Sequence, residues 1–235
     1  MIYNEVNLRQ DYPKKILGES IYIKARIGWK GLKKSEYIEK SEYRIINGES
    51  IKEGNIDWKK CGYISKERYL ESPEIMLQSN DIVMTKDGTI GKLGIIKSLR
   101  EKSTVASGLF VLRVLDKQIS YLYLYYYLCS PFFKELVKSR TEGSVIPHLY
   151  QRDLVNLEIP LPNYFTQISI ANILSSLDDK IELNNKINKN LEELAQTLYR
   201  RWFVDFEFPN DYGEPYQSSG GEMVETELGM IPKGW

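Results

Sequence analysis

Cysteine and histidine are scarce in this chain of 235 residues, which holds two cysteines, Cys61 and Cys129, and a single histidine, His148. The cysteines lie far apart with no second pair beside them, so the spacing of a Cys/His zinc site is absent. Sparse cysteine is typical of a reducing compartment, and the N-terminus, MIYNEVNLRQ, lacks the basic-then-apolar pattern of an export signal. The sequence therefore predicts a cytoplasmic protein without a metal site.

Long hydrophobic runs and catalytic motifs are also missing. No stretch approaches the roughly 18 apolar residues that cross a bilayer, so no membrane partner is expected. Gly88, Gly91 and Gly94 are not followed by the Gly-Lys-Ser/Thr of a P-loop, and PNYF at 162–165 does not match the Pro-Pro-aromatic motif of adenine methyltransferases. No Gly-x-Ser-x-Gly turn accompanies His148. We therefore expect no active site and no cofactor in this chain.

The formal net charge is zero, but the charges are unevenly divided along the chain. Residues 1–160 hold 26 lysine and arginine residues and 20 acids, which leaves +6, whereas residues 161–235 hold 6 and 12, which leaves −6. Residues 14–34 alone contain seven basic residues and one acid. A basic part followed by an acidic part suggests a polyanion as the partner of the basic part, although an ordinary uneven surface would give the same counts.

Short strands and helices are predicted for the first 160 residues, which indicates a mixed α/β domain. β-branched and aromatic runs occur in SIYIKARI, YRIING and KCGYISKERY. In DIVMTKDGTIGKLGII two apolar runs flank Asp87-Gly88, a pair that readily adopts the positive φ angles of a tight hairpin turn. Residues 105–115 predict another buried strand. Residues 119–139 predict a helix interrupted by a proline, and the tyrosines at 121–127 fit a core helix better than a base-stacking platform.

From Gln167 to Phe203 the chain has neither proline nor glycine, and apolar residues recur at alternating spacings of four and three. This heptad period predicts one α-helix, about 55 Å long, that packs lengthwise on another helix. A small domain cannot cover it, so its seam needs a second copy or another protein. The asparagines of the seam either fix its register or face solvent. The seam residues are Ile170, Leu174, Leu177, Ile181, Asn184, Ile187, Asn188, Leu191, Leu194, Ala195, Leu198 and Trp202, with Ile173 beside them.

Residues 205–235 contain seven acids, a Ser-Ser-Gly-Gly segment and no base before Lys233. We expect an acidic linker or tail, little of which packs firmly. The predicted fold class is therefore α+β, with a mixed α/β domain over residues 1–163, one long heptad-patterned helix over 164–204 and this tail over 205–235.

Three loops offer side chains suited to DNA. Lysine and arginine neutralise phosphates, and arginine can bind guanine through two hydrogen bonds. Each lysine alone is better explained as a solvated side chain, but their concentration on three loops favours a nucleic-acid surface. The residues are Arg26, Trp29, Lys30, Lys33 and Lys34 in the first string (25–37), Lys86, Thr89 and Lys92 on the hairpin, and Arg140, Ser144, His148, Gln151 and Arg152 in the last string (139–154).

These strings give the chain a family resemblance. ARIGWKGL, DIVMTKDGTIGKLGII, EGSVIPHLYQRDLVNLEIPLPN and, above all, ISIANILSSLDDKIELNNKINKNLEELAQTLYRRWFVDFEFP are similar to half of the specificity subunit of type I restriction-modification enzymes, over residues 20–209. The resemblance implies a target-recognition domain that binds double-stranded DNA and a spacer helix that pairs antiparallel with a second copy, so that two inverted half-sites are bound. It also implies modification (methyltransferase) subunits and a motor-nuclease restriction subunit as partners, which would carry S-adenosylmethionine, ATP and Mg²⁺.

The sequence departs from that family in three ways. One recognition domain and one helix are present where the family's subunit has two of each. ETELGMIPKGW resembles the opening of a second recognition domain, and NYFTQ at 163–167 replaces the usual Pro-Leu-Pro, acidic-Gln start of the helix. Two other hypotheses are open: a coiled-coil adaptor with a basic protein- or RNA-binding domain, and a stand-alone nuclease or methyltransferase, which activity of the chain alone would establish.

Overall fold

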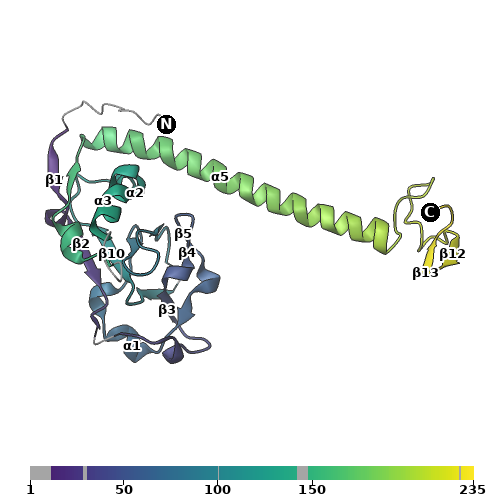
Figure 1. The fold of residues 1–235 in the computed structure, drawn as a ribbon, viewed down its shortest axis with the longest axis horizontal. Helices are drawn as coiled ribbons and strands as arrows, with labels where there is room; N and C mark the ends of the chain where they lie inside the picture. The colour runs from purple at the N-terminus through teal and green to yellow at the C-terminus, as the bar shows by residue number, and fades with distance from the viewer. Residues whose placement is uncertain (1–11, 29–30, 100, 142–147, 228) are drawn as a thin grey trace. The chain divides into compact units, whose positions relative to one another are not determined.

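The computed structural model describes residues 12–28, 31–99, 101–141, 148–227 and 229–235 (Figure 1). The described residues up to Leu174 form one compact unit, and those from Ser175 onward form a second. Within the described part of the chain, no helix combines the length and the apolar character that spanning a membrane requires.

An antiparallel sheet of four strands, in the order β2-β10-β7-β8, is the largest sheet of the first unit. Both of its faces are buried, because Ile82 and Met84 of β7 pack into one core and Val83 packs into another. A strand buried on both faces needs no polar residue at alternate positions, which explains the continuous apolar runs in the sequence. The strands are β2 (Ile21–Ala25), β7 (Ile82–Thr85), β8 (Leu93–Ile95) and β10 (Leu109–Val114).

Two consecutive helices, α2 (Tyr121–Cys129) and α3 (Pro131–Thr141), cover one face of this sheet (Figure 1). Leu124 and Phe133 belong to the same core cluster as the inward residues of β7 and β10. The Ser130 hydroxyl accepts a hydrogen bond from the Phe133 backbone N–H at 3.4 Å and so caps α3. Proline occupies the first position of α3, where a backbone N–H would have no partner within the helix. The interruption of the predicted helix is confirmed, as is the core position of its tyrosine-rich run.

A second sheet, in the order β6-β3-β9, lies toward the other face of the first. The middle strand β3 runs antiparallel to β6 and parallel to β9. Ile46 of β3 and Val105 of β9 pack in one cluster with Val83 and Val111 of the four-stranded sheet. The remaining elements here are β3 (Tyr43–Ile46), β4 (Ile51–Lys52), β5 (Asn55–Ile56), β6 (Gly62–Tyr63), α1 (Lys66–Leu70) and β9 (Lys102–Val105).

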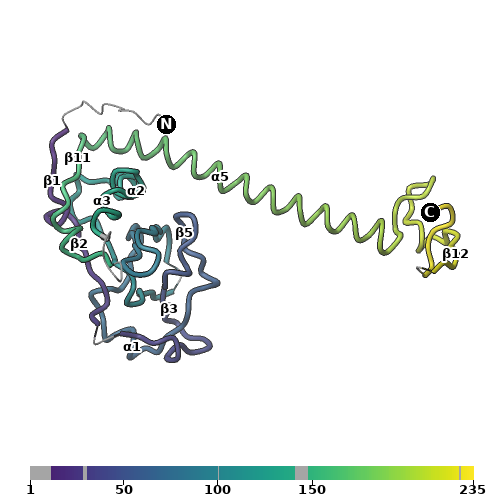
Figure 2. The backbone as a smooth tube through the Cα atoms, in the orientation of Figure 1, coloured from purple at the N-terminus to yellow at the C-terminus, as the bar shows by residue number. Residues whose placement is uncertain are grey.

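The first and last strands described in the first unit pair with each other. β1 (Lys14–Ile16) runs antiparallel to β11 (Glu158–Pro160), and the two lie side by side in Figure 2. A short helix, α4 (Gln151–Val155), precedes β11. Directly after β11 the chain enters α5 (Tyr164–Tyr199). Asn163 Oδ1 accepts a hydrogen bond from the Thr166 backbone N–H at 2.9 Å and so caps the start of this helix.

Gln167 attaches α5 to the first unit through a fully buried side chain. Its Oε1 accepts a hydrogen bond from the Ser120 backbone N–H at 2.9 Å, while its Nε2 donates to the carbonyls of Gln118 at 2.9 Å and Pro162 at 2.8 Å. Ala171, one turn later, is buried as well. These contacts explain why the first compact unit extends to Leu174, beyond the boundary predicted after residue 163.

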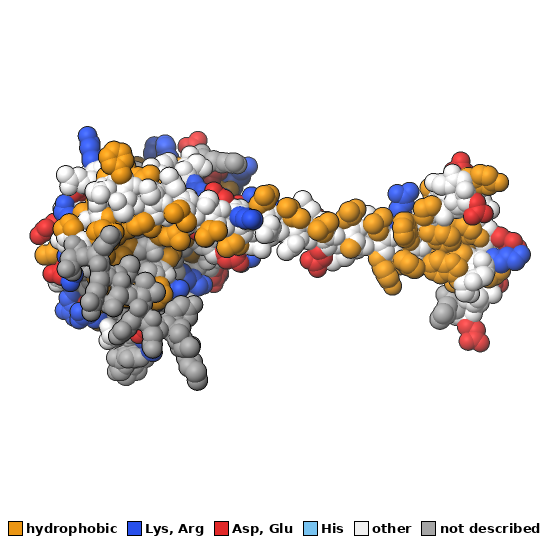
Figure 3. Space-filling view, turned by 90° about the horizontal axis from the view of Figure 1, so that it is seen from above, with side chains coloured by type: hydrophobic (Ala, Val, Ile, Leu, Met, Phe, Trp, Pro, Cys, Tyr) orange, Lys and Arg blue, Asp and Glu red, His pale blue; other side chains and the backbone are white. Residues whose placement is uncertain are grey.

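The rest of α5 is almost entirely exposed in the single chain, and it ends in one π-helical turn at Arg200–Val204. Leu177 is 54% exposed and Leu191 is 57% exposed. Apolar side chains follow one another along the helix in Figure 3. Asn184 and Asn188 are exposed too.

Residues 205–235 form an aromatic cluster and a hairpin, although most of their described side chains are exposed. The Trp235 ring stacks on Phe208 with centroids 5.3 Å apart and lies 5.6 Å from Phe203, and Phe208 also stacks on Tyr216 at 4.7 Å. A hairpin of β12 (Met223–Thr226) and β13 (Gly229–Pro232) completes the segment. The rings that form this cluster are Phe203, Phe206, Phe208, Tyr216 and Trp235.

Candidate nucleic-acid interface

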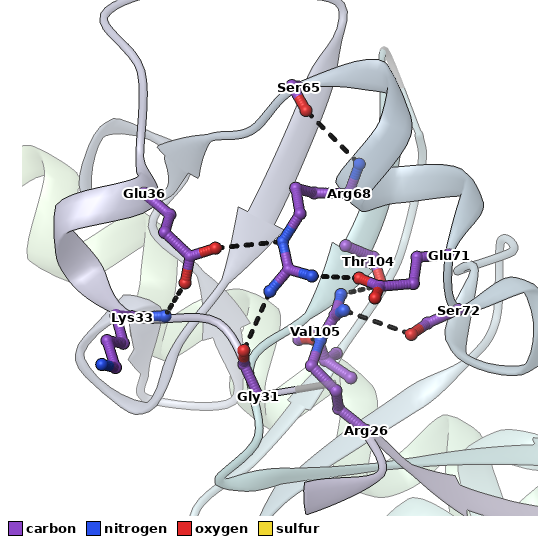
Figure 4. Close-up of polar contacts among 10 residues, drawn as sticks. All are labelled: Arg26, Gly31, Lys33, Glu36, Ser65, Arg68, Glu71, Ser72, Thr104 and Val105. Carbon is purple, nitrogen blue, oxygen red and sulfur yellow. Dashed lines mark hydrogen bonds and ion pairs between the residues drawn. The ribbon is translucent and has the colours of Figure 1, made fainter. Parts of the chain in front are cut away.

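Arg26 is buried, with 3% of its surface exposed. Its Nε donates to the Val105 carbonyl at 3.2 Å, Nη1 to Ser72 Oγ at 3.2 Å and Nη2 to Thr104 Oγ1 at 3.4 Å (Figure 4). Burial lowers the pKa of this guanidinium. The prediction that Arg26 contacts DNA is therefore corrected. Arg26 follows β2 directly, on the side that faces the interior, and its guanidinium is hydrogen-bonded within the protein. Trp29, Lys30 and Ser144 lie outside the described residues.

The loop that carries Lys33 and Lys34 is held by Arg68 of α1. The Arg68 Nη2 donates to the Gly31 carbonyl at 2.9 Å, and its Nε lies 3.2 Å from Glu36 Oε1 (Figure 4). Glu36 in turn accepts a hydrogen bond from the Lys33 backbone N–H at 2.7 Å. One guanidinium thus contacts both sides of the loop. The Lys33 and Lys34 side chains are exposed to solvent.

The hairpin between β7 and β8 has a longer loop than the tight turn predicted at Asp87-Gly88. Gly88 and Gly91 have positive φ angles of 66° and 80°, but Asp87 does not. The Thr85 hydroxyl closes the loop, donating to the Thr89 carbonyl at 2.5 Å and accepting from the Lys92 backbone N–H at 2.9 Å. The loop therefore spans residues 86–92, and its shape depends on a side chain that strand patterning does not identify.

Of the predicted site residues in this loop, Thr89 and Lys92 are exposed, whereas Lys86 is largely covered. The Lys86 ammonium lies 3.3 Å from the Asp87 carboxylate and 5.9 Å from the centre of the Phe110 ring. The Lys86 ammonium is therefore less accessible to DNA than its place in the sequence suggested.

Asp87 and His148 join the hairpin to the last of the three strings. The His148 Nδ1 is paired with Asp87 Oδ1, and the backbone N–H of Leu149 donates to the Lys86 carbonyl at 3.1 Å. The Gln151 amide donates to the Ile23 carbonyl of β2 at 3.0 Å. His148 and Gln151, both predicted to contact DNA, therefore have structural contacts that fix this segment against the sheet.

Arg140 and Arg152 lie together on a second surface. They line a cleft of about 440 Å³, and the Arg152 guanidinium lies 4.9 Å from the centre of the Tyr150 ring. Both arginines are exposed. The other residues that line this cleft are Leu136, Asp153, Asn156, Leu157 and Glu158.

A cleft of about 400 Å³ brings the first string and the hairpin together. Lys34 borders it on one loop, Lys92 on the other, and the turn at 47–49 forms a third side. Burial raises the pKa of Tyr37, so its phenol stays protonated and can donate a hydrogen bond. The lining residues are Leu32, Lys34, Tyr37, Asn47, Gly48, Glu49, Thr85, Asp87, Thr89 and Lys92.

The turn at 47–49 and the acids of the cleft were not among the predicted site residues. Glu49 was not predicted because the predicted DNA contacts were basic or neutral donors. Nothing in the linear sequence places Glu49 beside a hairpin more than thirty residues away. The pair Asn47-Gly48 could have predicted this turn, since asparagine followed by glycine is typical of turns. The cleft as a whole presents ammonium groups, carboxylates and hydroxyls, a mixture that can pair with donors and acceptors alike.

Known proteins provide an independent comparison. A family model described as "Type I restriction modification DNA specificity domain" matches residues 23–193. The type I restriction enzyme MjaIX specificity subunit of Methanocaldococcus jannaschii is 36% identical over 113 residues, which are 48% of this chain and 24% of that protein. The putative MjaX specificity subunit of the same organism is 27% identical over 212 residues, or 87% of this chain and 47% of that protein.

Solved structures share the fold. The S subunit of a type I restriction-modification system from M. genitalium matches with a TM-score of 0.59 and 20% identity, over 85% of this chain and 48% of that chain. The HsdS subunit from Thermoanaerobacter tengcongensis matches with a TM-score of 0.54 and 17% identity, over 86% and 47%. This chain spans less than half of the length of each of these relatives and solved structures.

Proposed function

Because this chain belongs to the family of type I restriction modification DNA specificity domains, we propose that its first compact unit binds a specific sequence of double-stranded DNA. The observation that carries the proposal is the gathering of three sequence-distant basic strings on one domain. The first string and the hairpin border one cleft, and Asp87 and His148 connect the hairpin to the third string. The exposed lysines and arginines on these strings would attract a polyanion.

Exposed cations would supply most of the affinity. Lys33, Lys34, Lys92, Arg140 and Arg152 are exposed and are free to approach phosphates, which carry most of the salt-dependent binding energy of DNA complexes. Thr89 can donate to a phosphate or a base. Arg26 and Lys86, which are largely covered, and Gln151, whose amide is bonded to the Ile23 carbonyl, would support the surface rather than contact the nucleic acid.

The long helix would pair antiparallel with the helix of a second copy. The support for this is its exposed heptad seam, with Leu177, Ile181 and Leu191 unburied in the single chain. A two-fold pair of helices would hold two copies of the DNA-binding unit at a fixed distance. Two-fold protein symmetry is mirrored in the DNA, so the bound site would be two inverted half-sites with a constant spacer.

Catalysis is assigned to partner subunits rather than to this chain. Methyl transfer from S-adenosylmethionine would belong to modification subunits, and ATP- and Mg²⁺-dependent cleavage to a restriction subunit. The exposed face of α5 and the aromatic residues Trp202 and Phe203 at its end are the candidate docking surfaces for them.

Methylome sequencing tests the proposal directly. Cells that express this chain with its modification partner should acquire methylation at one bipartite motif with a fixed spacer, and cells with the partner alone should not. The purified chain should also bind duplexes that contain this motif more tightly than scrambled duplexes. Methylation without a motif, or tighter binding to RNA or to a protein than to duplex DNA, would support the adaptor hypothesis instead.

A further inference from the structure

Glu49 borders the same cleft as the two exposed lysines Lys34 and Lys92. Its carboxylate lies 3.9 Å from the Lys34 ammonium, and the two side chains are 77% and 81% exposed. An ion pair with this separation and exposure contributes little to stability. The Glu49 carboxylate is therefore available to another hydrogen-bond donor.

The backbone that carries Glu49 is held firmly. Asn47 Oδ1 accepts hydrogen bonds from the backbone N–H groups of Glu49 at 2.9 Å and Ser50 at 3.0 Å, and Ser50 is fully buried. Gly48 lies against the base of the hairpin, because a Cβ at this position would be 3.3 Å from Thr85 Cγ2. Glu49 thus combines a fixed backbone with a free side chain, as a residue that contacts one particular base requires.

Asp87, the second acid among the described residues of the cleft, differs from Glu49. It is paired with His148 Nδ1, and the Lys86 ammonium lies 3.3 Å from its carboxylate. These contacts hold the hairpin to the segment that starts at His148. Asp87 therefore has a structural role, whereas the Glu49 carboxylate is not committed to one.

The chemistry of the cleft suits the edge of a base pair better than a phosphate alone. A carboxylate at the cleft would repel a phosphate. In the major groove, however, cytosine N4 and adenine N6 present amino donors, and carboxylates accept hydrogen bonds from such groups. Lys34 and Lys92, on loops to either side, could neutralise the flanking phosphates.

Building on the proposed DNA binding, we propose that Glu49 is a specificity-determining residue that accepts a hydrogen bond from the exocyclic amino group of a cytosine or adenine in the major groove. Glu49 discriminates between bases at one position of each half-site, and it does not increase the affinity for DNA in general. Its removal takes one negative charge from the surface, so binding to random DNA stays equal or becomes tighter.

Selection of duplexes from a randomised library by the full-length chain tests this inference. We compare the wild type with Glu49→Ala, and with Glu39→Ala as a matched control, because Glu39 is another exposed acid of the same unit that does not line the cleft. The wild type and Glu39→Ala should select one motif. Glu49→Ala should select the same motif with the preference for cytosine or adenine lost at one position per half-site. At that position the wild type should prefer the selected base about tenfold, and the variant should show a ratio near one.

A base analogue confirms the contact atom. Purine in place of adenine, or 2-pyrimidinone in place of cytosine, removes the amino group at that position. The analogue should weaken binding of the wild type about tenfold and leave binding of Glu49→Ala unchanged.

The two failures are distinguishable. If Glu49→Ala selects the wild-type motif with every preference intact, or loses all preferences together, the inference is overturned while the proposed function stands. A wild-type chain that selects no motif at all would overturn the proposed function, and the inference with it.

Discussion

The side chain of Gln167 accepts a hydrogen bond from the backbone N–H of Ser120 at 2.9 Å, and this contact ties the long helix to the cap of α2. Gln167→Ala would leave that N–H and the carbonyls of Gln118 and Pro162 without their partner. Unpaired buried polar groups are costly, so the free energy of unfolding should fall by about 1–3 kcal/mol. Urea denaturation measures this, with exposed Gln196→Ala as the control that should change it by less than about 0.5 kcal/mol. Equal losses for the two variants would mean that the buried amide does not secure the helix.

Arg26→Ala should act on stability rather than on DNA selectivity. The substitution removes three buried hydrogen bonds, so we expect the free energy of unfolding to fall by about 1–3 kcal/mol. Lys24→Ala, on the exposed side of β2, is the matched control and should be nearly neutral. In binding assays corrected for the folded fraction, Arg26→Ala should keep the wild-type ratio of affinities for cognate and scrambled duplexes. A selective loss of cognate affinity would restore Arg26 to the set of base contacts.

Alkaline pH should destabilise the first unit through Tyr123. Burial raises the pKa of Tyr123 to about 12, and its hydroxyl donates to the Pro160 carbonyl at 2.7 Å. In the unfolded chain the phenol ionises near pH 10, so between about pH 10 and 12 the unfolded state loses this proton first. The free energy of unfolding should be unaffected by this group below about pH 10 and should fall by on the order of 2 kcal/mol as the pH approaches 12.

Tyr123→Phe provides the control for this pH dependence. Near pH 8 it should cost about 1 kcal/mol, because the Pro160 carbonyl loses its donor. Between about pH 10 and 12 its stability should fall less than that of the wild type. The fall should not vanish, since burial also raises the pKa of Tyr127. Parallel curves for the two proteins would show that the Tyr123 phenol is not the group responsible.

Glutamate at Leu177, Ile181 and Leu191 should abolish the proposed helix pairing, because three carboxylates on each helix would face one another across the seam. Light scattering after size exclusion should show a monomer for this triple variant and a dimer for the wild type. Lys186→Glu combined with Gln196→Glu is a matched control: it changes the net charge by the same −3, with −2 from the first substitution and −1 from the second, on the opposite side of the helix. A dimer that persists in the triple variant would refute pairing through this seam.

Sequence periodicity predicted the long helix well, since a heptad pattern without proline or glycine is a local signal. The strands of the four-stranded sheet were also predictable, because both faces are buried and Ile82, Val83 and Met84 therefore follow one another. The family assignment is likewise confirmed, by a match over residues 23–193. What failed were predictions that depend on three-dimensional neighbours.

Arg26 and Glu49 illustrate that failure. A basic residue beside glycines in a basic string fits a DNA contact equally well whether it points outward or inward, and only the positions of Ser72, Thr104 and Val105 decide that Arg26 points inward. Glu49 shows the reverse case, since it was not predicted as a site residue. It borders the same cleft as Lys92 only once the hairpin folds against the turn at 47–49. The aromatic cluster around Trp235 escaped prediction for the same reason.

The pairing of β1 with β11 has a consequence for how such chains can diversify. Because the first and last strands described in the first unit are hydrogen-bonded neighbours, a foreign unit that begins and ends in an equivalent strand pair could be exchanged for it as one cassette. The long helix would keep its sequence. Under the proposed function, a single recombination product could thus acquire a new DNA target while the proposed pairing of the helix stays the same.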